Sequence, residues 1–471
     1  MNRRALAIFA VLFAVYAATL GLDAFGDSNY GGDEPHYLLA AQSIVHDRDV
    51  DLRDDYRARA YADFYPYPLD VHGVLTKGRL HEPHGVGFPL LIAPAYALGE
   101  WIDGARGGAV AVELLLAAIA ALAGALAYLL ALRVAPDPWA GGAALAVGLS
   151  PPLVAYGSAV YPELTAACAL AGAACCAASL HERISRRATF GCFALLGLLP
   201  WLGTKFVPAG IVIGAFALRS ILGANRRVLA LGGFEVAIFS VALYVGVNQG
   251  LYGGLTPYAA DDPGETATDA DGIGGYLERA YRLGALLIDR DYGLLRWAPL
   301  FALALFGVWL LWRSRREGLR RLAPDQEGVE RVALMCALAL GAQLLVAAFL
   351  APTMFGFWFP GRHLVAALPL AVPLVAWGLR HAPRVGSALA LIGLIASVWL
   401  YVDVRWGSGG LVIGVPDAPW GPLERAFPFF GSGPYAYVLV AALIGGLALV
   451  VFLSDRHSRQ SAGTTRAKYS G

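Results

Sequence analysis

The chain has 471 residues, of which 58% are hydrophobic and 15% charged, and its mean hydropathy is +0.57. This composition excludes a soluble globular protein and predicts a polytopic membrane protein embedded in a lipid bilayer. The formal net charge of +1 gives no basis for nucleic-acid binding through bulk charge. All five cysteines fall inside apolar runs, which indicates small buried side chains in place of disulfides or zinc ligands.

About twelve apolar runs have the length, roughly 17 to 25 residues, that a bilayer-spanning helix needs. In chain order they are Ala5–Phe25, Val110–Val134, Trp139–Tyr156, Leu164–Leu180, Ala188–Thr204, Phe206–Leu222, Val228–Leu251, Leu294–Trp312, Val332–Leu350, Leu364–Leu379, Ser387–Val404 and Tyr435–Leu453. Clusters of Lys and Arg fall between alternate runs, and placing every cluster in the cytoplasm leaves both termini inside. Most acids and most histidines then lie on the extracytoplasmic side.

A further apolar run, Val86–Ile102, is short and interrupted by two prolines. Counting it as a span would put every later basic cluster outside, so we expect a re-entrant or interfacial segment over 86–102. The prediction is one all-α transmembrane domain over residues 1–454. Its first extracytoplasmic loop, 26–109, is long, and residues 455–471 are expected to form a disordered cytoplasmic tail.

The first loop carries the motif Asp33-Glu34-Pro35-His36-Tyr37, close to the point where the first apolar run meets water. The proline predicts the first turn of a helix, and either carboxylate is suited to accept the free N–H groups of that turn. The alternative is a reactive acid held at the membrane surface beside an imidazole. The two interpretations are compatible, because a carboxylate that caps a helix is also held rigidly.

Later in the same loop, His81, Glu82 and His84 lie close together and raise the possibility of a metal site. The spacing differs from the i, i+4 pair of a helical metal site, and Pro83 interrupts it. We therefore favour a substrate contact from His84 over metal coordination. Alternating acids and bases over residues 47–59 indicate a solvated helix face.

Two ionisable residues stand at the outer ends of apolar runs. Glu163 is either a helix cap or a site residue, since a carboxylate at that depth is costly unless it is paired or faces a wet cavity. Lys205 is a lone cation between two runs, on the side away from the basic clusters. Its ammonium either extends to lipid headgroups or binds a specific lipid phosphate, and we favour the phosphate.

Two later segments place arginines beside aromatic residues at the outer membrane edge. Arg296 precedes the run that starts near 294, while Arg362 and His363 precede the run that starts at 364. Guanidinium groups favour phosphate or pyrophosphate, and aromatic rings favour sugar faces. An ordinary aromatic belt explains Trp358, but it explains the Gly361-Arg362-His363 sequence less well.

These motifs in this order resemble the GT-C class of integral-membrane glycosyltransferases. The likeness is greatest to the glycosyltransferase family 39-like branch of protein O-mannosyltransferases and lipid A aminoarabinose transferases. It rests on the Asp33–Tyr37 motif after the first span, the Lys205 turn between two short spans and the outer Gly361–His363 segment. It covers the first two-thirds of the chain best. The resemblance implies a GT-C-like bundle of about twelve helices, with juxtamembrane helices in the first loop.

The resemblance also implies an activity: inverting transfer of a hexosyl or pentosyl group from a polyprenyl-phosphate sugar to an acceptor hydroxyl. The acceptor would be a lipid, a glycan or a protein, and the site would face outward from a multi-pass protein of the plasma membrane. Asp33 would be the general base, and a departing lipid phosphate would be neutralised by Lys205 with Arg362 and Arg296. No cofactor is certain, and a divalent metal is left open.

The predicted catalytic acids are therefore Asp33 and Glu34. The predicted substrate-binding residues are His36, Tyr37, His84, Glu163, Lys205, Arg296, Arg362 and His363. His36 departs from the family, which more often has arginine before the tyrosine, so His36 is expected to take over an acceptor or phosphate contact. The rival functions are a polysaccharide ligase or polymerase and a transporter or flippase of lipid-linked sugars. Charges at the outer edge and not at mid-membrane, and the early position of the largest outer loop, favour the transferase.

Overall fold

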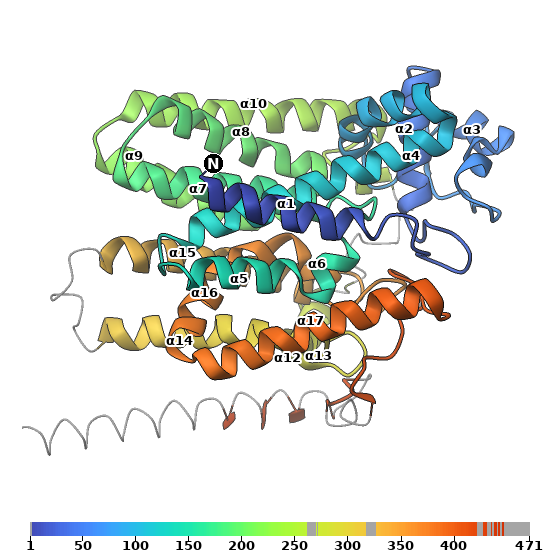
Figure 1. Cartoon of the computed structure of the whole chain (residues 1–471). Helices are drawn as coiled ribbons and strands as arrows, with labels where there is room; N and C mark the ends of the chain where they lie inside the picture. Colours follow the sequence, from blue (N-terminus) through green and yellow to red (C-terminus); the bar gives the residue numbers. More distant parts are fainter. Residues whose placement is uncertain are drawn as a thin grey trace, which may run out of the picture.

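The computed structural model describes residues 2–260, 270, 272–316, 326–421 and 427–430, together with scattered positions between 435 and 446. The elements within this part of the chain are mostly helices that run side by side in a bundle, with the first loop at one end (Figure 1). The helices are α1 (Arg3–Ala17), α2 (Glu34–His46), α3 (Arg53–Ala58), α4 (Gly87–Ala131), α5 (Trp139–Gly148), α6 (Pro151–Ala155), α7 (Glu163–Glu182), α8 (Arg186–Leu202), α9 (Val207–Gly223), α10 (Arg227–Leu251), α11 (Gly272–Glu278), α12 (Arg282–Ile288), α13 (Leu294–Trp297), α14 (Ala302–Arg316), α15 (Gln326–Leu345), α16 (Leu368–His381) and α17 (Pro383–Trp406). Strands β1 (Val74–Thr76) and β2 (Arg79–His81) pair antiparallel in the first loop, with Val74 opposite His81.

Seven helical segments in the described part of the chain are long and apolar enough to cross a membrane. They are Gly87–Ala131, Glu163–Glu182, Thr204–Gly223, Arg227–Leu251, Glu327–Leu350, Arg362–His381 and Pro383–Trp406. Each contains or overlaps a run that the sequence predicts as a span, so the expectation of a multi-pass helical membrane protein is confirmed. The number of about twelve helices stays a prediction, and most of the last predicted span and all of the 455–471 tail lie outside the described residues.

Three predicted spans are wrong as continuous helices. The run 5–25 is helical only to Ala17, because the main-chain N–H groups of Thr19 and Leu20 bond three residues back and Gly21 adopts a left-handed φ of 73°. The run 139–156 is divided between α5 and α6, and the run 294–312 between α13, a 3₁₀ turn and α14. These two runs break at Pro151 and at Pro299, because a proline cannot donate the main-chain bond that a continuing helix needs.

The segment 86–102 is the first arm of α4, which folds back on the spanning arm as a helical hairpin. Asp103 (φ −145°, ψ 37°) and Gly104 (φ 62°, ψ −162°) form the sharp turn between the arms. Gly99 lies against the main chain of Gly107 so closely that a β-carbon on either residue would overlap the other. The interfacial position of this arm stays a prediction, and its tip exposes the apolar Trp101.

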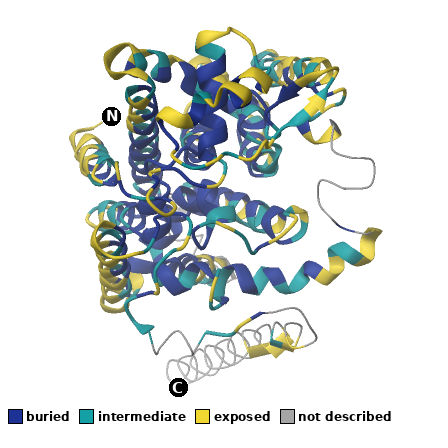
Figure 2. Cartoon of the chain, turned by 90° about the vertical axis from the view of Figure 1, so that its right-hand side faces the viewer, coloured by how far each residue is buried: buried dark blue, intermediate teal, exposed yellow. Residues whose placement is uncertain are grey.

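The core of the bundle is made of small residues on α7 and larger apolar residues on α16. Nearly all of α7 is buried between α4, α8 and α9, because its many alanines allow close helix approach. Helix α16 is buried in turn against α4, α5, α14 and α15. Figure 2 shows buried residues in the middle of the molecule and exposed residues around its rim. The first residue of α7 is Glu163, and Arg362 begins the 3₁₀ turn that leads into α16, so two central elements start with a charge.

Candidate active site

The first acidic motif places its two carboxylates in different environments. Asp33 occupies the N-cap position of α2, yet its side chain makes no capping bond. The prediction that Asp33 or Glu34 caps this helix is wrong, because both side chains bond to other parts of the chain. Glu34 Oε2 accepts from the Gly31 N–H (2.8 Å) and Glu34 Oε1 accepts from the Val160 N–H (2.7 Å). Glu34 is therefore buried, and its two hydrogen bonds link the first loop to the segment that precedes α7.

Asp33 belongs to a chain of four charged side chains that we call the ion-pair chain: Asp33, Arg362, Glu163 and Lys205. Arg362 donates from Nη2 to Asp33 Oδ2 at 3.0 Å and from Nε to Glu163 Oε1 at 3.2 Å. Lys205 Nζ donates to the same oxygen of Glu163 at 2.9 Å. Acids and bases thus alternate along the ion-pair chain, and all four residues are among the predicted site residues. They come from four segments of the sequence, three of which are the N-terminal ends of α2, α7 and the α16 segment.

Two aromatic rings hold the guanidinium of Arg362 in place. Its central carbon lies 4.4 Å from the ring centroid of Tyr161 and 5.4 Å from that of Trp358. Tyr161 is itself fixed, since its hydroxyl donates to the Gly31 carbonyl (3.0 Å) and accepts from the Asp33 N–H (3.3 Å). Gly361 has φ of 88°, a left-handed conformation that allows the chain to turn immediately before Arg362. Tyr161 is not among the residues predicted for the site, although it stands two residues before Glu163.

Exposure rises toward both ends of the ion-pair chain. The exposed fraction of the side chain is 2% for Glu163, 13% for Arg362, 22% for Asp33 and 40% for Lys205. Burial disfavours the ionised form of Asp33, but the charges of Arg362 and His84 outweigh this effect and hold its pKa well below the usual range. For Glu34, burial dominates and raises the pKa to about 7. Asp33 is therefore an ionised carboxylate paired with Arg362, and Lys205 is the more solvent-exposed cation of the ion-pair chain.

Histidines surround Asp33 on the side of the first loop. His84 Nδ1 bonds to Glu82 Oε1 at 2.8 Å, and although burial disfavours the charged imidazole, Glu82 outweighs it and raises the pKa of His84. His36 Nδ1 lies 2.6 Å from the Tyr56 hydroxyl, and burial with a nearby His72 lowers the pKa of His36 to about 4. The His72 ring lies 5.3 Å from the His36 ring and 5.6 Å from the His84 ring. Nothing in the sequence around His72 marks it, because only the fold brings it beside the other two.

His81, Glu82 and His84, considered above as a possible metal site, do not converge on one point. His81 Nδ1 bonds to the Val50 carbonyl at 2.9 Å, while Glu82 is engaged by His84. Among the described residues, no group of three or more His, Cys, Asp or Glu side chains is placed to hold a metal ion.

Three other predicted substrate-binding residues have contacts of their own. The Tyr37 ring is buried between those of His84 (5.8 Å) and Tyr161 (6.4 Å), within the same site. The His363 ring packs on Trp358 at 5.2 Å. Arg296, on α13, faces Asp417 at 3.8 Å.

No protein-family model and no curated protein sequence matches this chain. Among solved structures, the apo form of the Archaeoglobus fulgidus oligosaccharyltransferase matches 92% of this chain and 59% of its own, with a TM-score of 0.50 and 14% sequence identity. The chain has the GT-C fold. The resemblance inferred from the short motifs is therefore confirmed at the level of the fold. The apo crystal structure of ArnT from Cupriavidus metallidurans, another GT-C protein, matches 89% of this chain and 67% of its own, with a TM-score of 0.49 and 16% identity.

Proposed function

We propose that this protein is a membrane glycosyltransferase. It moves a hexosyl or pentosyl group from a polyprenyl-phosphate sugar to a hydroxyl of a lipid, glycan or protein acceptor. The observation that carries the proposal is the ion-pair chain at the first-loop end of a GT-C bundle, in which Arg362 pairs with the Asp33 carboxylate and Glu163 joins Arg362 to Lys205. Sugar transfer from a lipid phosphate needs a base for the acceptor and positive charge for the leaving group. We place this end of the bundle on the extracytoplasmic face of the plasma membrane.

The reaction we propose is a single displacement with inversion at the anomeric carbon. The Asp33 carboxylate takes the proton of the acceptor hydroxyl, while the hydroxyl oxygen forms a bond to the anomeric carbon. The bond from that carbon to the phosphate oxygen breaks, and the electron pair leaves with the lipid phosphate. Lys205 and Arg362 neutralise the charge that builds on this phosphate in the transition state. His36, Tyr37 and His84 surround the place where the acceptor would sit and orient it.

In the proposed mechanism, Asp33 becomes an effective base only after the donor has bound. Arg362 bonds to Asp33 at 3.0 Å and keeps the carboxylate a weak base. A donor phosphate that accepts hydrogen bonds from Arg362 competes with Asp33 for this guanidinium. The pKa of Asp33 then rises toward the usual range, and its basicity increases only when the donor is present. Glu34 supports the site indirectly by holding the loop that carries Asp33.

The test is sugar transfer by purified protein in lipid nanodiscs. Candidate polyprenyl-phosphate sugars are offered with a membrane extract as acceptor. We expect Asp33→Asn to reduce transfer about 100-fold or more while donor binding persists. We expect Lys205→Ala to weaken donor binding, because the ammonium that meets the phosphate is lost. Two exposed residues of the same loop provide matched controls, Asp70→Asn and Lys77→Ala, which should behave like the wild type.

Three outcomes would contradict the proposal. Full transfer by Asp33→Asn would exclude Asp33 as the base. Movement of a lipid-linked sugar across the bilayer without any transfer would assign the protein to the flippases. Polymer formation from lipid-linked oligosaccharides alone would indicate a ligase or polymerase.

A further inference from the structure

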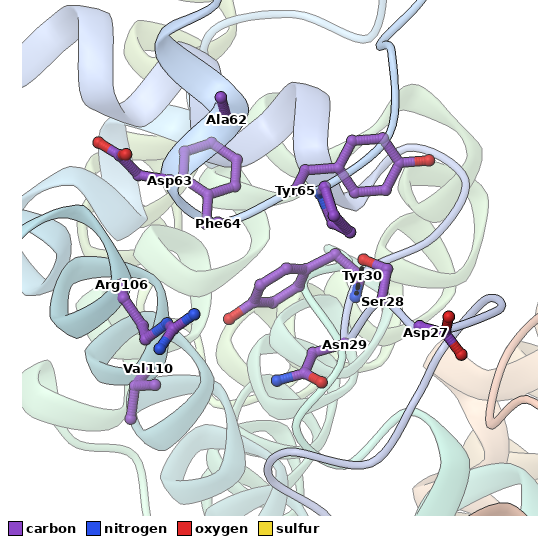
Figure 3. Close-up of a pocket in the computed structure, with 11 residues that line it drawn as sticks. Asp27, Ser28, Asn29, Tyr30, Ala62, Asp63, Phe64, Tyr65, Arg106 and Val110 are labelled. Atoms are coloured by element: carbon purple, nitrogen blue, oxygen red, sulfur yellow. Dashed lines mark hydrogen bonds between the residues drawn. The ribbon is translucent and has the colours of Figure 1, made fainter.

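A separate pocket of about 470 Å³ opens between the first loop and the spanning arm of α4. Its wall is built from the segment before the acidic motif, the segment that follows α3 and one face of α4. None of the four residues of the ion-pair chain lines it. We call it the Tyr30 pocket, after the residue at its centre in Figure 3. Its volume is in the range of sites that enclose small organic ligands.

The wall of the Tyr30 pocket is held rigidly. Tyr30 is 4% exposed, and its hydroxyl donates to Glu113 Oε2 at 3.1 Å. Glu113 is a carboxylate buried inside a predicted span, and this bond satisfies one of its oxygens. The ring of Phe64 meets that of Tyr30 edge-on at 6.3 Å, with 88° between the ring planes. Such a wall needs little reorganisation when a ligand arrives.

The lining alternates flat aromatic rings with polar groups. Figure 3 shows Phe64 and Tyr65 on one side of the pocket, Tyr30 and Asn29 on the other, and the Arg106 guanidinium at one end. Arg106 is exposed and forms no ion pair with another described residue. Its planar donors are therefore available to a ligand.

This combination fits a sugar ring better than other ligands. The C–H face of a pyranose packs on aromatic rings, while its hydroxyls exchange hydrogen bonds with an amide, a guanidinium and a carboxylate such as Asp27. A phosphate would favour several cations without acids in the lining, and an acyl chain would leave the polar groups unsatisfied.

The lower edge of the pocket continues onto an apolar helix face. Val110 lines the pocket and is 37% exposed, and Leu114, one turn further along α4, is 40% exposed. Both residues lie on the predicted membrane-spanning arm, so an alkyl chain lying along them would extend into the bilayer. A ligand that fits both parts has a sugar headgroup and a lipid anchor.

We propose that the Tyr30 pocket binds a sugar of a membrane-anchored glycan, with the lipid chain along Val110 and Leu114. The assignment of this glycan as the acceptor rests on the proposed transferase function. The pocket then serves as a subsite that holds one sugar of the acceptor outside the reacting centre. The binding itself is independent of any chemistry at Asp33.

Photocrosslinking tests the proposal with the full chain in phospholipid nanodiscs. The probes are dodecyl glucoside, dodecyl mannoside and dodecyl N-acetylglucosaminide, each with a diazirine in the alkyl chain. The matched probe carries the same chain on phosphocholine. We expect at least one glycoside to label the peptide that contains Val110 and Leu114, and the corresponding free methyl glycoside to compete. Arg106→Ala should reduce this labelling about tenfold, because a charged hydrogen bond to the sugar is lost.

Arg57→Ala is the matched control, since Arg57 is an exposed arginine on α3 outside the pocket. It should label like the wild type, and so should Asp33→Asn. Equal labelling by the phosphocholine probe, or labelling unchanged in Arg106→Ala, would overturn the sugar site. If labelling is as expected but the protein transfers no sugar, the sugar site is supported and the proposed transferase function is refuted. If the protein transfers sugar but shows no glycoside-specific labelling, the transferase function is supported and the sugar site is refuted.

Discussion

Replacing Glu163 by glutamine tests whether the ion-pair chain stabilises the folded protein. Glu163 is 2% exposed, and its Oε1 accepts hydrogen bonds from both Arg362 and Lys205. It is also the first residue of α7, where a negative charge interacts favourably with the helix dipole. The amide of Glu163→Gln has the same shape, but it leaves two neighbouring cations facing each other without the charge that separates them.

The size of the effect follows from how much charge stays buried. Removing one member of a buried ion pair costs about 3 to 5 kcal/mol. Arg362 keeps Asp33 as a partner, and Lys205 is 40% exposed and therefore partly solvated, so we expect the lower end, about 3 kcal/mol. The free energy of unfolding can be measured in mixed micelles by titration with sodium dodecyl sulfate, followed by tryptophan fluorescence.

The same helix offers a matched control at its other end. Glu182 is the last residue of α7, is 63% exposed and pairs with Arg133. A solvated pair of this kind contributes at most about 1 kcal/mol, so Glu182→Gln should change the unfolding free energy little. Equal losses in the two variants, or a more stable Glu163→Gln protein, would refute the reasoning that the buried pairs stabilise the fold.

Two further predictions concern titration. Burial raises the pKa of Glu34 from about 4.5 to about 7, so the folded protein holds this proton more tightly than the unfolded chain does and stability falls as pH rises across that window. Glu34→Gln should remove this part of the slope in unfolding experiments run from pH 4.5 to 7, and an unchanged slope would contradict the raised pKa. Burial disfavours charged His84, but Glu82 outweighs it, so the stabilising contribution of His84 is complete below about pH 6.5 and is lost as pH rises through its raised pKa. Glu82→Gln should lower the pKa of His84 in a side-chain NMR titration, whereas an unshifted titration would exclude Glu82 as the cause.

The members of the ion-pair chain could be predicted from the sequence, but their pairing could not. Each is an ionisable residue at or near the end of an apolar run, where a charge is costly unless it is paired or used. That argument applies to each position separately. Arg362 is 329 residues from Asp33 and 199 from Glu163, and no local pattern relates residues so far apart. The pairing depends on helix packing, which brings the starts of α7 and of the α16 segment to one end of the bundle.

Other features were missed for identifiable reasons. Glu113 could have been predicted as a paired or functional residue, because it is a carboxylate inside the apolar run 110–134. The hydrogen bond from Tyr30 provides the partner that this buried carboxylate needs. Tyr161 gave no such signal, because a tyrosine near a membrane edge is ordinarily part of an aromatic belt. The breaks at Pro151 and Pro299 follow from the two prolines, but the length of an apolar run alone does not reveal them.

The exposure gradient along the ion-pair chain indicates which end would meet a lipid phosphate first. The two acids and two bases balance, so an anion gains little from the chain as a whole unless it displaces a carboxylate. Glu163 is the least exposed member at 2% and Lys205 the most exposed at 40%, so the lysine is the cation that a phosphate would reach first. A phosphate that binds Lys205 weakens the ion pair between Lys205 and Glu163. Glu163 can then form a stronger ion pair with Arg362. The Arg362 bond to Asp33 loosens as a result, so charge arriving at one end of the chain would free the carboxylate at the other.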